Sequence, residues 1–160
     1  MKTIKILSIP AIISIILALA FKPFDELYVE SENAKIGNLS DGIYEGYSRS
    51  VYTSENFWGH AKVKVINGKF TDIWFTIRDS TAHESVDSLY GVKHYSDNAM
   101  YMQQCVDDGN GIKNYPKEFI RKQNVDEVDA VTGATWSYRI FKASVQEALK
   151  KSPVKTVPVK

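Results

Sequence analysis

Apolar and polar residues alternate through three consecutive segments in the first half of the chain, residues 39–53, 59–68 and 69–80. Period-two alternation is typical of strands that bury one face. The second and third segments are joined by Asn67-Gly68, a dipeptide that favours tight antiparallel hairpins because both residues tolerate positive φ. These features predict a small antiparallel β-meander.

The pattern becomes helical after a segment rich in turn-forming residues. Residues 80–97 predict a long loop or an irregular crossover. Residues 98–111 have helical spacing and finish with glycines, which predict a stop. Residues 114–124 predict a second short helix with Pro116 in its first turn. Residues 125–131 predict a short strand or an extended segment.

The last predicted helix, residues 132–151, has the most regular pattern. Its apolar or small side chains recur at helical spacing, at Ala134, Tyr138, Phe141, Val145 and Ala148. Strands followed by helices favour an α+β fold, in which helices pack on one face of a small antiparallel sheet. We expect this domain to span residues 39–150, after a linker over 22–38 and before a flexible tail over 151–160.

The N-terminus has the layout of an export signal. Two lysines precede an apolar run that ends at Phe21 and contains no charged residue, and Ala18-Leu19-Ala20 resembles a cleavage site. Residues 1–21 are therefore expected to be a secretory signal peptide or, if uncleaved, a membrane anchor. Either interpretation places the body of the protein outside the cytoplasm, as a secreted, periplasmic or outward-facing anchored protein.

Composition narrows the possible partners. The 160-residue chain is 44% hydrophobic and 24% charged, with a formal net charge of +1, so nucleic acid is not expected as a partner. The single cysteine, Cys105, excludes an internal disulfide and is expected to be a small buried hydrophobe. His60, His83 and His94 have no metal-ligand partners at useful spacing, and no hydrolytic arrangement is recognisable. Neither a metal site nor a catalytic residue is predicted.

The start of the last helix offers a place for a phosphate. Thr132 is suited to be the N-cap, and Gly133 and Ala134 leave the backbone uncovered. A helix N-terminus holds a phosphate with its unpaired N–H groups. The hydroxyl of Thr135, in the first turn, is thus placed to carry a phosphoester. The alternative is an ordinary capped helix, and the residue pattern alone leaves both open.

The sequence around this helix start resembles a known family. "DAVTGAT", Asp129 to Thr135, matches the Asp-x-x-Ser/Thr-Gly-Ala-Thr motif of the FMN-binding domain family, which occurs in peripheral flavin subunits of sodium-pumping NADH:quinone oxidoreductases and Rnf-type complexes. "DGIYEG" and "VKVINGKFTDIWF" are also similar to family segments, so the resemblance covers roughly residues 40–150.

The resemblance implies a covalent cofactor. In the family a dedicated flavin transferase esterifies the last threonine of the motif with FMN, so the acceptor here would be Thr135 and the motif acid Asp129. Thr132, Gly133 and Ala134 would form the turn on the phosphate side. Trp136 departs from the small or hydroxylated residue that usually follows the acceptor, and its ring would either cover the flavin or hinder the transferase.

The flavin ring needs a partly apolar slot. The aromatic candidates are Trp58, Trp74, Tyr90 and Trp136. His83 and Glu84 lie in the long loop, where the family often contacts the flavin. The competing interpretation of each aromatic is ordinary core packing, and of the neighbours Trp74 and Phe75 one is expected to face outward.

The expected function follows from this resemblance. A small FMN domain without a second substrate domain would act as an electron-transfer relay that exchanges electrons with redox partner proteins at the membrane. Two alternatives stay open: a secreted binding or interaction module of the same fold with weak or no FMN, and a small flavin-dependent reductase.

Overall fold

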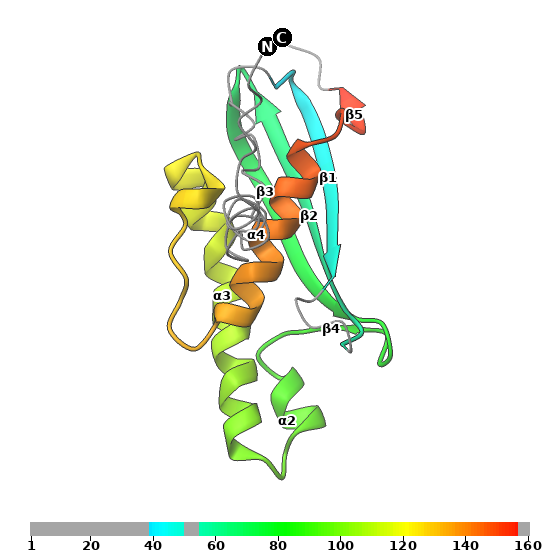
Figure 1. Cartoon of the computed structure of the whole chain (residues 1–160), viewed down its shortest axis with the longest axis vertical. Coiled ribbons are helices and arrows are strands. Elements are labelled where there is room, and N and C mark those ends of the chain that lie inside the picture. The colour runs from blue at the N-terminus through cyan, green and yellow to red at the C-terminus, as the bar shows by residue number, and fades with distance from the viewer. Residues whose placement is uncertain (1–38, 50–54, 157–160) are drawn as a thin grey trace, which may run out of the picture. The chain divides into compact units, whose positions relative to one another are not determined.

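The computed structural model describes residues 39–49 and 55–156. They form a five-stranded antiparallel sheet in the order β4-β3-β2-β1-β5, with helices on one face (Figure 1). The predicted α+β fold is confirmed. The predicted leader and linker lie outside the described residues. Within the described ranges, no helix has the length and apolar character needed to cross a membrane.

Three long strands make up the centre of the sheet: β1 (Gly42–Arg49), β2 (Phe57–Ile66) and β3 (Lys69–Asp79). The predicted hairpin between β2 and β3 is confirmed, with Asn67 at φ 51° and Gly68 at φ 67°. These left-handed values match the twist of the two flanking strands.

Two short strands extend the sheet at its edges. β4 (Glu84–Ser85) pairs with the end of β3, and α2 (Tyr90–His94) follows it, both inside the segment predicted as a loop. β5 (Lys155–Thr156) pairs with β1. The chain end predicted as a flexible tail thus contributes an edge strand.

α3 (Ala99–Lys122) is one helix of 24 residues, where the sequence predicted two helices separated by a glycine stop. The glycines do not end the helix because packing uses their small size. A Cβ at Gly109 would lie 3.1 Å from Ser88 N, and one at Gly111 would lie 2.7 Å from the ring of Tyr115. Pro116, predicted in a first turn, lies inside the helix, where its missing N–H removes one intrahelical hydrogen bond.

The segment after α3 is not a strand. It forms the 3₁₀ helix η3 (Val125–Glu127) and then an extended stretch that leads to α4 (Thr135–Leu149). The preceding turn is fixed by Gln123, whose side-chain amide exchanges two 2.8 Å hydrogen bonds with the backbone of Phe70 on β3. This pairing takes the place of a strand at that point.

α4 packs closely on the sheet because two glycines lie beneath it. A Cβ at Gly46 would lie 2.2 Å from the α4 backbone, and one at Gly59 would lie 2.3 Å from Ile140 Cγ2. The core between helices and sheet includes these fully buried large side chains: Tyr44, Tyr115, Phe119, Phe141, Ile77 and Ile140.

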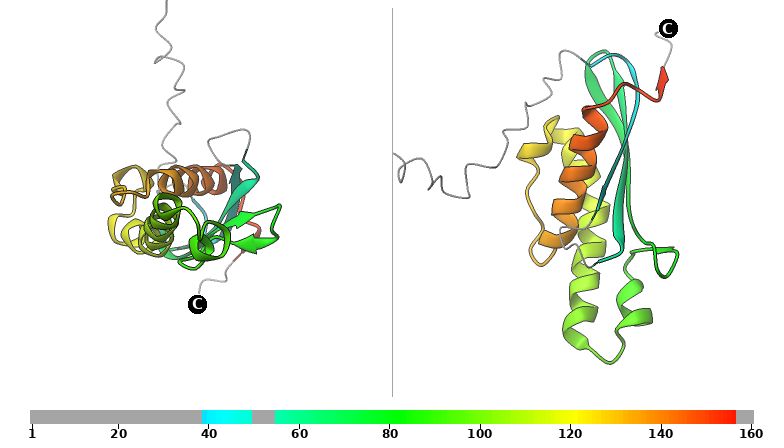
Figure 2. Two further views of the ribbon diagram at one scale, coloured as in Figure 1. Left: turned by 90° about the horizontal axis from the view of Figure 1, so that it is seen from below. Right: turned by 45° about the vertical axis from the view of Figure 1, so that its right-hand side comes forward.

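The other face of the sheet carries no helix of the described ranges (Figure 2). Of the neighbours Trp74 and Phe75, Trp74 is the exposed one. Its ring lies against the edge of His60, with centroids 4.9 Å apart, and His60 in turn stacks on Tyr47.

Candidate functional site

The three residues that lead into α4 each have a distinct physical role. Gly133 adopts φ 80°, and a Cβ there would lie 2.4 Å from Asp107 Oδ2, so only glycine fits. Ala134 is fully buried, and its carbonyl accepts a hydrogen bond from the Tyr115 hydroxyl at 2.8 Å. Thr135 then begins the helix and is exposed to solvent. The turn therefore presents a threonine hydroxyl at the surface.

The N-cap of α4 is Ala134, and the prediction of Thr132 in this role is wrong. The left-handed turn at Gly133 delays the helix start, so that an alanine without a side-chain acceptor occupies the cap position. Asp108 of α3 supplies the acceptor instead. Its Oδ1 accepts from the backbone N–H of Ser137 at 3.1 Å and from the Ser137 hydroxyl at 2.7 Å.

Asp108 is an unusual capping group because it is only 3% exposed. Burial raises the pKa of its carboxyl, and the hydrogen bonds from Ser137 counteract part of that increase. The neighbouring Asp107 carboxylate also raises the pKa of Asp108. The start of α4 is thus held by acidic groups.

A pocket of about 110 Å³ opens beside this helix start. Half of its lining residues are aromatic; the lining residues are Glu55, Phe57, Val86, Tyr90, Tyr95, Tyr101, Gln104, Cys105, Asp108 and Trp136. Trp136 directly follows Thr135, so the pocket and the exposed hydroxyl are neighbours. The Trp136 indole N–H donates to Glu55 Oε2 at 2.9 Å, and its ring meets Phe57 edge-on at 5.2 Å.

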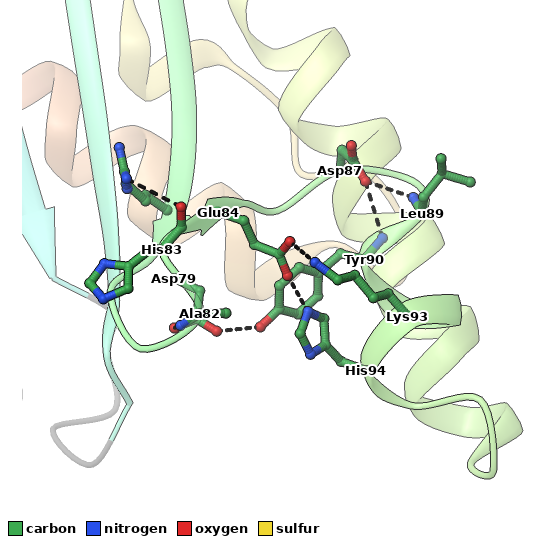
Figure 3. A network of polar contacts seen from close by, with 10 residues as sticks. Asp79, Ala82, His83, Glu84, Asp87, Leu89, Tyr90, Lys93 and His94 are labelled. Atoms are coloured by element: carbon green, nitrogen blue, oxygen red, sulfur yellow. Dashed lines mark hydrogen bonds and ion pairs between the residues drawn. The ribbon is translucent and has the colours of Figure 1, made fainter.

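Tyr90 is fixed in the pocket wall by a buried hydrogen bond. Its hydroxyl donates to Asp79 Oδ2 at 2.5 Å (Figure 3). Burial raises the pKa of Tyr90, and the Asp79 carboxylate raises it further. Burial alone would raise the pKa of Asp79, but the hydrogen bonds from Tyr90 and two backbone N–H groups lower it overall. The pair therefore keeps a protonated phenol against an ionised carboxylate at neutral pH.

Glu84 and His83 do not line the pocket. The Glu84 carboxylate contacts Lys93 and His94 of α2 (Figure 3), and the hydrogen bond from Lys93 lowers its pKa. It thereby ties β4 to the helix that carries Tyr90. His83 lies in an exposed turn at φ 57°, and its carbonyl accepts from Arg78.

Asp129 and Trp74 also lie apart from the pocket. The Asp129 side chain is 89% exposed and pairs with Lys122 Nζ at 2.8 Å, which lowers its pKa. Trp74 is on the sheet face opposite the helices and is 51% exposed. Of the predicted site residues, the structure brings together Thr135, Trp136, the turn before them and, in the pocket wall, the aromatic candidate Tyr90.

The sequence analysis missed Tyr95, Tyr101 and Asp108 as site residues. Their signal is weak because they come together only when the segment before α3 folds back along that helix. Cys105 is half-buried and lines the pocket, so the expectation of a buried hydrophobe is only partly met. Burial raises the pKa of its thiol, which keeps it protonated at neutral pH.

An exposed threonine hydroxyl and an open pocket rich in aromatic side chains are thus carried by adjacent residues. The hydroxyl of Thr135 makes no hydrogen bond to any described residue, so it is available as an ester acceptor. The pocket is smaller than the roughly 150 Å³ cavity that holds one benzene. A three-ring system seated there would bury one end and leave the opposite edge at the surface.

Comparisons with known proteins bear on the family and the fold. A family model described as FMN-binding domain matches residues 56–150. A crystal structure of a protein from Clostridium perfringens is 21% identical, with a TM-score of 0.55, and the match covers 75% of this chain and 99% of that one. A solution NMR structure of a protein from Clostridium thermocellum is 19% identical, covers 76% and 100%, and has a TM-score of 0.45. No curated protein sequence matches the chain. The first likeness supports the fold alone.

Proposed function

The chain is a member of the FMN-binding domain family, and from that premise we propose that it carries FMN covalently on Thr135 and relays electrons outside the cytoplasm. The observation that carries this proposal is the exposed, uncommitted hydroxyl of Thr135 next to an aromatic pocket.

The bond that the proposal requires joins Thr135 Oγ to the phosphorus of the flavin phosphate, supplied by a flavin nucleotide donor in which that phosphate is part of a phosphoanhydride. The P–O bond of the anhydride breaks, the second phosphate of the donor departs with its substituent, and the hydroxyl proton leaves with it. A flavin transferase is the expected maturation partner. Asp129, exposed on the approach to α4, is accessible to such an enzyme. The turn at Gly133 and the buried Ala134 hold the acceptor outward, which a transferase active site needs.

The pocket residues would receive the ring of the flavin. Tyr90 and Tyr95 line one part of the pocket, and Trp136 lines another and is fixed by Glu55. Once bound, the flavin supplies one- and two-electron chemistry. The protein positions it and leaves one edge open to a partner. A tether suits a protein outside the cytoplasm, where a dissociated cofactor would be lost.

The location is part of the proposal and is supported by the apolar N-terminal run. Redox proteins at the membrane are the expected electron donors and acceptors. N-terminal analysis of protein from the native envelope distinguishes a cleaved leader from a retained anchor.

The decisive experiment is mass spectrometry of the full chain produced with and without a flavin transferase. We expect a mass gain of one FMN less one water, located on the peptide that contains Thr135. Thr135→Ala should abolish the gain and Thr135→Ser should retain it. Thr71→Ala is the control, since Thr71 is an exposed threonine of β3 that lies outside the motif. A mass gain that survives in Thr135→Ala would refute the assignment.

A further inference from the structure

The start of α4 is an unfavourable place for a doubly charged phosphate. Asp108 Oδ1 already accepts from the Ser137 N–H at 3.1 Å, and the Ala134 N–H donates to the Val131 carbonyl at 2.9 Å. Two of the N–H groups that a helix N-terminus normally offers to an anion are therefore committed. The group that commits one of them is itself a carboxylate.

Further acids surround the same position. Asp107 Oδ2 lies 2.4 Å from the position that a Cβ of Gly133 would take, two residues before Thr135, and Glu55 is hydrogen-bonded to Trp136 directly after it. All three acids, Asp107, Asp108 and Glu55, thus lie next to the turn that carries the acceptor hydroxyl. Their fields add to oppose a second negative charge.

Basic residues are sparse on the helices that carry Asp107, Asp108 and Thr135. Arg139 is the one basic residue on α4 within a turn of Thr135, at the i+4 position, from which a long side chain reaches back toward the helix start. α3 carries no basic residue from Ala99 to Ile112. On α2, Lys93 and His94 are paired with Glu84.

The charge of the phosphate depends on whether it is esterified. A phosphomonoester carries about −1.5 to −2 at neutral pH, whereas a phosphodiester carries a single negative charge, which Arg139 alone can match. We propose that this site discriminates by phosphate charge: without the covalent bond it binds riboflavin, the same ring without a phosphate, more tightly than free FMN. This inference rests on the proposed function, because it assumes that the pocket takes the flavin ring.

The test uses the full chain produced without a flavin transferase, titrated separately with riboflavin and FMN while flavin fluorescence is followed. At low salt we expect riboflavin to bind about tenfold more tightly than FMN, the effect of the phosphate charge that Arg139 leaves unmatched near these partly screened carboxylates. At about 0.5 M salt the ratio of the FMN dissociation constant to the riboflavin dissociation constant should fall to less than about threefold.

A substitution that removes one of the negative charges tests whether the acids cause the preference for riboflavin. Asp107→Asn should raise the affinity for FMN several-fold and leave that for riboflavin unchanged, and its amide can keep the contact with Gln103. Asp72→Asn, on an exposed position of β3, is the matched control and should leave the ratio unchanged. Equal affinities, tighter FMN binding or a failure of both ligands to bind would each overturn the inference.

The outcome is distinguishable from failure of the proposed function. If the Thr135 peptide gains FMN but the ligands show no preference, only the selectivity inference fails. If riboflavin is preferred but no mass is gained, the pocket assignment stands and the covalent proposal fails.

Discussion

Removing the capping carboxylate of α4 should destabilise the whole domain. Asp108 lies on α3, yet it accepts the hydrogen bonds that fix the first turn of α4. We predict that Asp108→Ala lowers the free energy of unfolding substantially, whereas Asp108→Asn, which keeps an acceptor oxygen of the same shape, lowers it much less.

The magnitude follows from the groups left behind. The Ser137 hydroxyl also lies 3.1 Å from the Ala134 carbonyl, so it keeps a partner after the substitution, but the buried Ser137 N–H loses the one acceptor that it has among the described residues. An unsatisfied buried donor costs about 1–3 kcal/mol, and loss of a cap about 0.5–2 kcal/mol. Both figures describe the same hydrogen bond, so they are not added. The free energy of unfolding should fall by about 2 kcal/mol for Asp108→Ala and by less than about 1 kcal/mol for Asp108→Asn.

Urea unfolding followed by far-UV circular dichroism measures this difference. With a slope of about 2 kcal/mol per molar, the midpoint of Asp108→Ala should fall by roughly 1 M. Asp107→Ala is the control, because Asp107 neighbours Asp108 but its carboxylate accepts a hydrogen bond from Gln103 and not from the start of α4. If both alanine variants shifted the midpoint equally, the capping argument would be refuted.

The raised pKa of Asp108 adds a pH signature to the same experiment. Burial, the main cause, makes the folded protein bind a proton at Asp108 more readily than the unfolded chain does. Between the ordinary aspartate pKa of about 3.9 and the raised folded value, this residue's contribution to stability therefore falls as pH rises. The slope should be absent in Asp108→Asn.

Three further predictions concern the scaffold. Gly46→Ala places a Cβ 2.2 Å from the α4 backbone and should cost about 2–3 kcal/mol in urea unfolding, whereas Gly68→Ala, with open space but φ 67°, should cost only about 1 kcal/mol. Tyr90→Phe removes the donor that lowers the pKa of Asp79; stability should fall by about 1–3 kcal/mol at pH 7, and the loss should shrink as pH falls below the ordinary aspartate pKa of about 3.9 toward the lowered folded pKa of Asp79. Pro116→Ala restores an N–H inside α3 and should raise the melting temperature, by an amount equivalent to about 1 kcal/mol.

The sheet and α4 were predictable because their signals are local. Strand alternation and the Asn67-Gly68 turn depend only on neighbouring residues, and both predicted the observed meander. The continuity of α3 was not predictable in this way. Gly109 and Gly111 are helix breakers by propensity. They are needed within α3 because the backbone of Ser88 approaches Gly109 and the ring of Tyr115 approaches Gly111 too closely for a larger side chain.

The same distinction between local and long-range signals applies to the site. Thr135 and the turn before it follow from a contiguous motif, whereas the pocket is assembled from four separate segments. Trp74 shows what a local pattern cannot decide. The alternation along β3 indicates that Trp74 and Phe75 face opposite ways, but it does not say which face the helices cover.

Asp108 and Thr135 have separate roles at the start of α4, which explains how the helix can be capped while the Thr135 hydroxyl stays available for esterification. A threonine that caps its own helix uses its hydroxyl oxygen as an acceptor for a backbone N–H, and such a hydroxyl is not free to be esterified. Here Asp108 does the capping from α3, the cap position holds an alanine, and Thr135 follows with an uncommitted hydroxyl. Esterification would therefore remove no hydrogen bond from the fold, and the helix that supports the attachment point would not depend on the atom that is modified.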